Sequence, residues 1–173
     1  MSSQYDNYIQ DHLDVFLDAE LNTRNITSGT FLDIGTYDGS QAHFLSEKGF
    51  TVTATDKQRK VLQTAIQNYP NVNFIHDDMC NTKITDTFDY VLDRGCYHQQ
   101  ESDNQKTYIK NLHKLCDKLL FLKIITDTSL PQHKDIEHIK TNFGNYFNIL
   151  SVTDTTWSPT ATGLSQFLVM ESK

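Results

Sequence analysis

The chain has 173 residues, and its 22 Asp and Glu outnumber its 15 Lys and Arg, so the formal net charge is −7. This length predicts a single domain over residues 1–173 with a core of its own. The lack of basic runs disfavours nucleic acid as a partner. The three cysteines have no C-x-x-C spacing and indicate reduced thiols rather than a disulfide framework or a zinc site.

Apolar runs in the sequence are short. None reaches the roughly 18 residues that a membrane-spanning helix needs, and the polar residues 1–11 lack the apolar core of a signal peptide. We therefore expect a cytoplasmic protein that binds a small molecule, with no nucleic-acid or membrane partner. Nothing in the sequence indicates an oligomeric state.

Strand-like and helical patterns alternate along most of the chain. An amphipathic helix at residues 5–21 comes first. Runs rich in β-branched and aromatic residues then predict strands at 30–34, 50–55, 72–75, 88–92 and 119–126. Apolar residues at helical spacing predict helices at 40–48, 57–69, 103–116 and 131–143. Pro131 suits the first turn of the last of these helices.

The C-terminal part has a different character. Residues 147–153 and 164–170 both have a strand pattern, and the connection between them is too short for a crossover helix, so they predict an antiparallel hairpin. The β–α alternation before them predicts parallel strands with helices on both faces. The expected fold class is therefore α/β, with a doubly wound, mostly parallel, seven-stranded Rossmann-like sheet that ends in an antiparallel hairpin.

Acidic or glycine-containing segments follow the first four predicted strands. Ligands of open α/β sheets bind at the carboxyl ends of the strands, so four segments are expected to meet there: residues 33–40, 56, 77–79 and 93–98. Asp56 lies 21 residues beyond Gly35, where a carboxylate can accept hydrogen bonds from ribose hydroxyls. A dinucleotide fingerprint would need glycines where this chain has Tyr37 and Ser40, which disfavours NAD.

The same four segments resemble, in order, the motifs of the class I, seven-stranded S-adenosylmethionine-dependent methyltransferases. Residues 31–40 look like the first motif, Asp56 matches the second, 73–79 resembles the acidic end of the third strand, and 88–98 resembles the fourth motif. The fourth is similar to the small-molecule subset that includes thiopurine and thiol methyltransferases. The resemblance covers residues 5–170. It implies S-adenosyl-L-methionine as cofactor and methyl transfer to a sulfur, selenium, oxygen or nitrogen atom of a small molecule.

The resemblance also implies roles for individual residues. Asp33 would anchor the amino group of the cofactor, Asp56 would bind the ribose hydroxyls, and Asp78 would accept a hydrogen bond from the adenine amino group. Other cofactor contacts are expected from the same turns, at Gly35, Thr36, Tyr37, Gly39, Lys57, Met79 and Asp93. Asp93 and His98 are the candidates for catalytic proton handling or acceptor orientation. The helix within residues 1–21 would cover the cofactor site, and no metal is expected.

Tyr37 departs from the family pattern, which usually has glycine at this position. Because tyrosine carries a Cβ, a positive φ is costly here, and the ring must lie beside the ligand or turn away from it. A module that binds S-adenosylmethionine or a related nucleoside without catalysis therefore stays open as an alternative. An NAD-dependent oxidoreductase is a less favoured one. Methyl transfer itself is an in-line displacement, in which positioning supplies much of the rate.

Overall fold

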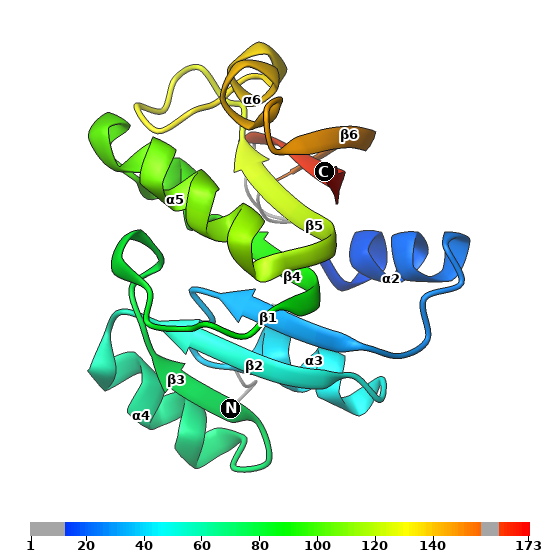
Figure 1. Ribbon diagram of the computed structural model, residues 1–173, viewed down its shortest axis with the longest axis vertical. Coiled ribbons are helices and arrows are strands. Elements are labelled where there is room, and N and C mark those ends of the chain that lie inside the picture. The colour runs from blue at the N-terminus through cyan, green and yellow to red at the C-terminus, as the bar shows by residue number, and fades with distance from the viewer. Residues whose placement is uncertain (1–12, 157–162) are drawn as a thin grey trace.

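The computed structural model describes residues 13–156 and 163–173. Within these residues, seven strands form one mixed sheet in the order β3-β2-β1-β4-β5-β7-β6 (Figure 1). The strands are β1 Thr30–Ile34, β2 Thr51–Asp56, β3 Asn73–His76, β4 Phe88–Arg94, β5 Cys116–Ile125, β6 Phe147–Thr156 and β7 Leu164–Ser172. The first five are parallel, and β7 pairs antiparallel with both β5 and β6. The predicted fold class is confirmed.

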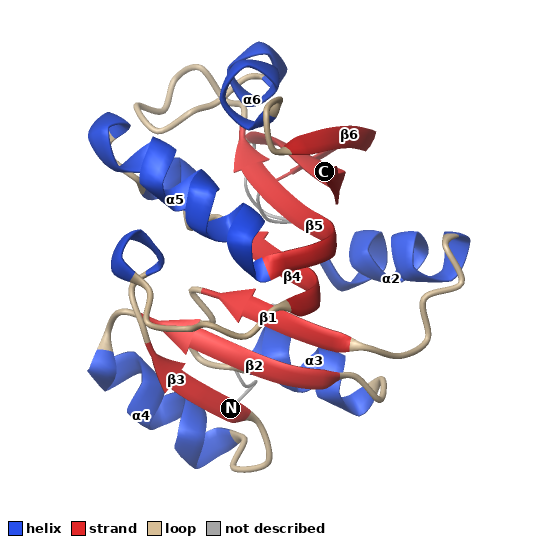
Figure 2. Ribbon diagram, in the orientation of Figure 1, coloured by secondary structure: helices blue, strands red, loops and turns tan. Residues whose placement is uncertain are grey.

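Helices cover both faces of the sheet (Figure 2). They are α2 Leu13–Thr23, α3 Ser40–Glu47, α4 Arg59–Asn68, α5 Ser102–Leu115 and α6 Ile136–Phe143. One buried cluster joins α5 and α6 to strand residues such as Leu32 and Leu122, and a second joins α2 and α3 to residues such as Phe31 and Phe121. Successive strand residues point to opposite faces, so a strand such as β1 supplies both clusters. No helix among the described residues has the length and apolar character needed to cross a membrane.

Two predicted helices have different limits in the structure. The helix expected at 131–143 begins only at Ile136, because the Asp135 side chain caps it by accepting a hydrogen bond from the backbone N–H of His138 at 2.7 Å. Pro131 lies in the connector before that cap. The helix expected at 5–21 is helical from Leu13 and continues to Thr23. Its first residues lie outside the described part.

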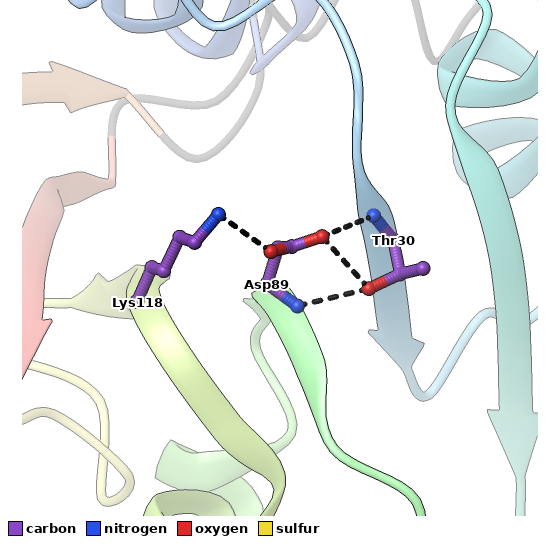
Figure 3. Close-up of polar contacts among 3 residues, drawn as sticks. All are labelled: Thr30, Asp89 and Lys118. Carbon is purple, nitrogen blue, oxygen red and sulfur yellow. Dashed lines mark hydrogen bonds and ion pairs between the residues drawn. The ribbon is translucent and has the colours of Figure 1, made fainter.

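The amino-terminal edge of the central strands is fixed by a polar cluster of Thr30, Asp89 and Lys118 (Figure 3). The backbone N–H and the hydroxyl of Thr30 donate to Asp89 Oδ2 at 2.9 and 3.1 Å, and the Asp89 N–H donates back to the Thr30 hydroxyl at 2.9 Å. Lys118 Nζ lies 2.7 Å from Asp89 Oδ1. The hydrogen bond from Lys118 and those from Thr30 lower the pKa of Asp89. This cluster joins β1, β4 and β5 at the edge opposite the turns described next.

Candidate functional site

A cavity of about 280 Å³ opens at the carboxyl ends of β1, β2 and β4. Its lining comes from four separate stretches of the chain and from α5: Ile34, Gly35, Tyr37, Thr55, Asp56, Lys57, Gln58, Asp77, Asp78, Met79, Gly95, Cys96, Gln99, Gln100 and Tyr108. Among the predicted cofactor residues, the cavity brings together Gly35, Tyr37, Asp56, Lys57, Asp78 and Met79. It does not include Asp33, Thr36, Gly39, Asp93 or His98.

Two glycines shape the turn between β1 and α3. Gly35 has a φ of +69° and Gly39 a φ of +83°, both in the left-handed region that favours glycine. A Cβ at Gly35 would overlap Cys96 Sγ, and a Cβ at Gly39 would lie 2.8 Å from the Phe74 ring and 3.0 Å from Ala65 Cβ. The first glycine therefore lets the turn approach the loop after β4, and the second lets α3 begin close to β3 and α4.

Tyr37 adopts the left-handed conformation that the sequence predicts to be costly, with a φ of +55°. Its backbone N–H donates to Asp56 Oδ2 at 3.2 Å. The side chain is 53% exposed, so the protein core does not pack around the ring. The ring-bearing residue nevertheless lines the cavity. The turn thus holds a large aromatic side chain at the edge of the cavity in a conformation that glycine would adopt more easily.

Asp56, the last residue of β2, connects two turns. Its Oδ2 accepts from Tyr37, and its Oδ1 accepts from the backbone N–H of Gln58 at 2.8 Å, directly before α4. The residue is 8% exposed and lines the cavity. Because each carboxylate oxygen can accept more than one hydrogen bond, Asp56 can hold both turns and still bind a ligand hydroxyl.

Asp77 and Asp78 follow β3, and both line the cavity. Asp78 is exposed, and its Oδ1 accepts from the backbone N–H of Cys80 at 2.9 Å, which caps the short helix η1 (Met79–Asn81). Asp77 is buried, and its Oδ1 accepts from the Lys83 N–H at 2.8 Å. Asp77 Oδ2 is buried and has no hydrogen-bond partner among the described residues. The sequence prediction chose Asp78 alone, whereas the structure places both acids at the cavity.

Asp33 is fully buried in β1, next to the lining residues Ile34 and Gly35. The side-chain amide of Gln41 donates to Asp33 Oδ1, and Asp33 Oδ2 has no hydrogen-bond partner in the described part of the chain. Burial raises the pKa of Asp33 to about 6, and the neighbouring side chains of Thr36 and Gln41 only partly offset that rise. The Asp33 carboxyl group is therefore only partly ionised near pH 6.

Asp93, at the end of β4, directs its carboxylate into the protein. The backbone N–H groups of Gly95 and Cys96 donate to its Oδ1 at 3.1 and 2.7 Å, and the Tyr97 N–H donates to Oδ2 at 3.1 Å. The Tyr108 hydroxyl donates to the same Oδ2 at 2.7 Å. Burial raises the pKa of Asp93 to about 6 against the opposing effect of these donors. Asp93 thus fixes the loop that carries Gly95 and Cys96 to the cavity.

His98 and Cys96 lie in that loop but differ in position. His98 is buried away from the cavity lining, and burial together with the charge of Lys134 lowers its pKa to about 4. Its imidazole is therefore neutral at pH 7. Cys96 lines the cavity, and burial with the negative charges of Asp93, Asp56 and Asp33 raises the pKa of its thiol. The thiol stays protonated and is a poor nucleophile.

Sequence reasoning missed several lining residues. Gln100 connects the loop after β4 to the short helix η1, since its Nε2 donates to the Cys96 carbonyl at 2.8 Å and its Oε1 accepts from the Cys80 thiol at 3.3 Å. Tyr108 reaches the cavity from α5. Its spacing, one turn before Leu112, indicates a buried position but not a functional one. Glutamines in a loop carry no comparable signal.

The charges and unpaired atoms of the cavity suit the cofactor that the resemblance implies. S-adenosylmethionine carries a sulfonium and an ammonium group, and the lining offers three carboxylates at Asp56, Asp77 and Asp78 against the single cation of Lys57. The buried Oδ2 of Asp77, which has no hydrogen-bond partner among the described residues, is an acceptor in the lining that a ligand's N–H or O–H group can satisfy. No group of three or more His, Cys, Asp or Glu side chains in the described residues is arranged to hold a metal ion.

Comparison with known proteins gives concordant matches. The family model described as a methyltransferase domain matches residues 31–118, just over half of the chain. An uncharacterised methyltransferase of Schizosaccharomyces pombe is 26% identical over 110 residues, which cover 60% of this chain and 76% of that protein.

Solved structures share the fold over nearly the whole chain. Magnesium protoporphyrin IX methyltransferase from Synechocystis, crystallised with bound S-adenosylhomocysteine, superposes with a TM-score of 0.79 at 20% identity, covering 95% of this chain and 83% of that one. A didemethyltoxoflavin N1-methyltransferase from Burkholderia thailandensis, with its substrate and S-adenosylhomocysteine bound, gives a TM-score of 0.72 at 19% identity, with 98% and 87% covered.

Proposed function

This chain belongs to the methyltransferase domain family, which makes it an S-adenosylmethionine-dependent methyltransferase, and we propose that its methyl acceptor is a small molecule. The observation that carries this proposal is the cavity itself. Carboxylates from β2 and from the loop after β3 meet at one hollow, beside the glycine turn after β1. The structural neighbours named above include enzymes whose substrates are small molecules, a porphyrin and a toxoflavin precursor. We place the chain in the small-molecule subset that includes thiopurine and thiol methyltransferases.

The proposed cofactor contacts follow the geometry of the turns. Asp56, already oriented by two backbone N–H groups, binds the ribose hydroxyls. Asp78 and the backbone of Met79 bind the adenine, with Asp77 adjacent to both. Asp33 accepts from the cofactor's ammonium group through its unpaired Oδ2. Gly35, Thr36 and Gly39 shape the turn below the cofactor, and Lys57 lies at its ribose side. When bound, the cofactor supplies an electrophilic methyl group on a sulfonium.

The acceptor side has no strong base among the predicted catalytic residues. With a pKa lowered to about 4, His98 is a weak proton acceptor at neutral pH, and it is buried outside the cavity lining. Asp93 is held by four donors and acts by positioning the 95–97 loop. We therefore propose an acceptor that ionises readily, such as a thiol or selenol, since its anion needs little help from the protein. The helix within residues 1–21 was expected to cover the cofactor site. Residues 1–12 lie outside the described part of the chain, and no residue of α2 lines the cavity.

Titration calorimetry tests the cofactor assignment. The unmodified protein is expected to bind S-adenosylmethionine and S-adenosylhomocysteine at micromolar concentration and not to bind NAD. Asp56→Ala should weaken both by at least tenfold, because it removes the proposed ribose acceptor and loosens two turns. Asp117→Ala, an exposed acid at the start of β5, is the matched control and should bind normally. Equal affinity in Asp56→Ala and the unmodified protein contradicts the ribose assignment.

A panel of small acceptors tests the second half. Transfer of a labelled methyl group to thiols and selenols is expected to exceed transfer to amines and phenols of similar size. Preferential methylation of amines or phenols contradicts the absence of a base. Absence of transfer to every member, with cofactor binding intact, favours a module that binds without catalysis.

All three cysteines are free thiols, which supports the proposed cytoplasmic location.

A further inference from the structure

The packing of the Tyr37 side chain does not offset the strain in its backbone. A bulky residue in the left-handed region costs about 1–2 kcal/mol relative to the ordinary conformations. Such strain persists where surrounding structure or function maintains it. Here the side chain is 53% exposed, so burial of the ring in the unliganded protein does not offset the cost. The backbone hydrogen bond to Asp56 requires only the N–H group, which glycine would supply equally well.

Tyr37 lines two separate hollows. One is the main cavity of about 280 Å³, and the other is a smaller one of about 100 Å³ that Tyr37 shares with Asp38, Val61 and Thr64 of the turn and α4. Because Tyr37 is largely exposed and borders both hollows, its ring can rotate about its side-chain bonds toward either one. The hydrogen bond from the Tyr37 backbone N–H to Asp56 holds this turn beside the carboxylate that is proposed to bind the ribose.

We infer that Tyr37 is a cofactor-binding residue whose ring covers the adenosine part of S-adenosylmethionine, and that the left-handed turn is retained to place this ring. The inference rests on the proposed function and extends it from the backbone of the turn to its side chain. Because the adenosine part is common to cofactor and product, the ring stabilises S-adenosylmethionine and S-adenosylhomocysteine alike. Stacking of an aromatic ring on a base or sugar face removes apolar area of both from water.

Substitutions at this one position separate ring from backbone. Tyr37→Gly removes the ring and the strain together, so the thermal midpoint of the unliganded protein should not fall. Its Kd for both ligands should rise at least about fivefold, the change that corresponds to about 1 kcal/mol, the lower end for one stacking contact. Tyr37→Phe keeps the ring and is the matched control, with affinity within about twofold of the unmodified protein.

Protection from nitration gives a second readout. Tyr37 should be nitrated readily in the unliganded protein and slowly with S-adenosylhomocysteine bound. The buried Tyr97, which does not line the cavity, is an internal control that reacts slowly in both states. Unchanged affinity in Tyr37→Gly, or equal nitration with and without ligand, overturns the inference. A loss confined to S-adenosylmethionine also overturns it, because it assigns the ring to the sulfonium instead. If the unmodified protein binds neither ligand, the proposed function fails before this question arises.

Discussion

Substitution of Gly35 by alanine tests how closely the turn after β1 approaches the loop after β4. The added methyl group meets two separate costs. A φ of +69° is unfavourable for alanine by about 1–2 kcal/mol, and its overlap with Cys96 Sγ requires repacking worth about 1–3 kcal/mol. Gly35→Ala is therefore expected to lower the free energy of unfolding by about 2–5 kcal/mol. It should also weaken cofactor binding, since Gly35 lines the cavity.

The chain offers a control for each cost. Gly49 has a φ of +93°, and a Cβ added there would meet no atom within 4 Å, so Gly49→Ala should show the conformational cost alone, about 1–2 kcal/mol. In a Cys96→Ala background the sulfur is gone and the Cβ of residue 96 lies 3.6 Å from the added methyl group, an ordinary contact. The steric cost of Gly35→Ala should then disappear while the conformational cost remains.

Urea denaturation of the two single variants, the double variant and Gly49→Ala measures these differences, and calorimetry with S-adenosylhomocysteine measures binding. A coupling energy of at least about 1 kcal/mol between positions 35 and 96 is expected for groups in direct contact. If Gly35→Ala costs no more than Gly49→Ala, and Cys96→Ala does not change that cost, the close approach of these two loops is wrong.

Three further predictions concern ionisation and hydrogen bonding. Burial raises the pKa of Asp33 to about 6, and only the ionised carboxylate attracts an ammonium group. Cofactor affinity measured by calorimetry should therefore rise between pH 5 and pH 7, and Asp33→Asn should abolish that rise. A pH-independent Kd contradicts the proposal that Asp33 binds the cofactor's ammonium group. Tyr108→Phe removes a 2.7 Å hydrogen bond to the buried Asp93 and should cost about 1.5–3 kcal/mol in urea denaturation, whereas no loss would show that Asp93 is held adequately by the loop. The pKa of Asp89 is lowered in the folded protein, so its ionised form contributes stability above the unfolded-state pKa, and this stability is lost as the pH falls through the folded-state pKa. Asp89→Asn should therefore reduce the free energy of unfolding at pH 7 and leave the cofactor Kd unchanged. Altered cofactor binding would contradict the separation of this cluster from the cavity.

Sequence patterns predicted the order and type of the main elements because each depends on local periodicity and on Gly or Pro at element ends. They also predicted that Gly35, Asp56 and Asp78 would meet, since parallel strands bring their carboxyl ends to one edge. The orientation of Asp93 was not predictable. It depends on three N–H groups of the following loop, whose conformation only the folded chain defines. The late start of α6 reflects a similar local competition, in which the Asp135 cap prevails over Pro131.

The cluster of Thr30, Asp89 and Lys118 (Figure 3) lies at the amino-terminal ends of β1, β4 and β5, and none of its three residues lines the cavity. Improvement of packing or charge there can compensate for the strained geometry at Tyr37 without contact with the cofactor. The amino-terminal and carboxyl ends of the strands can therefore change independently in evolution, the first under selection for stability and the second under selection for substrate choice.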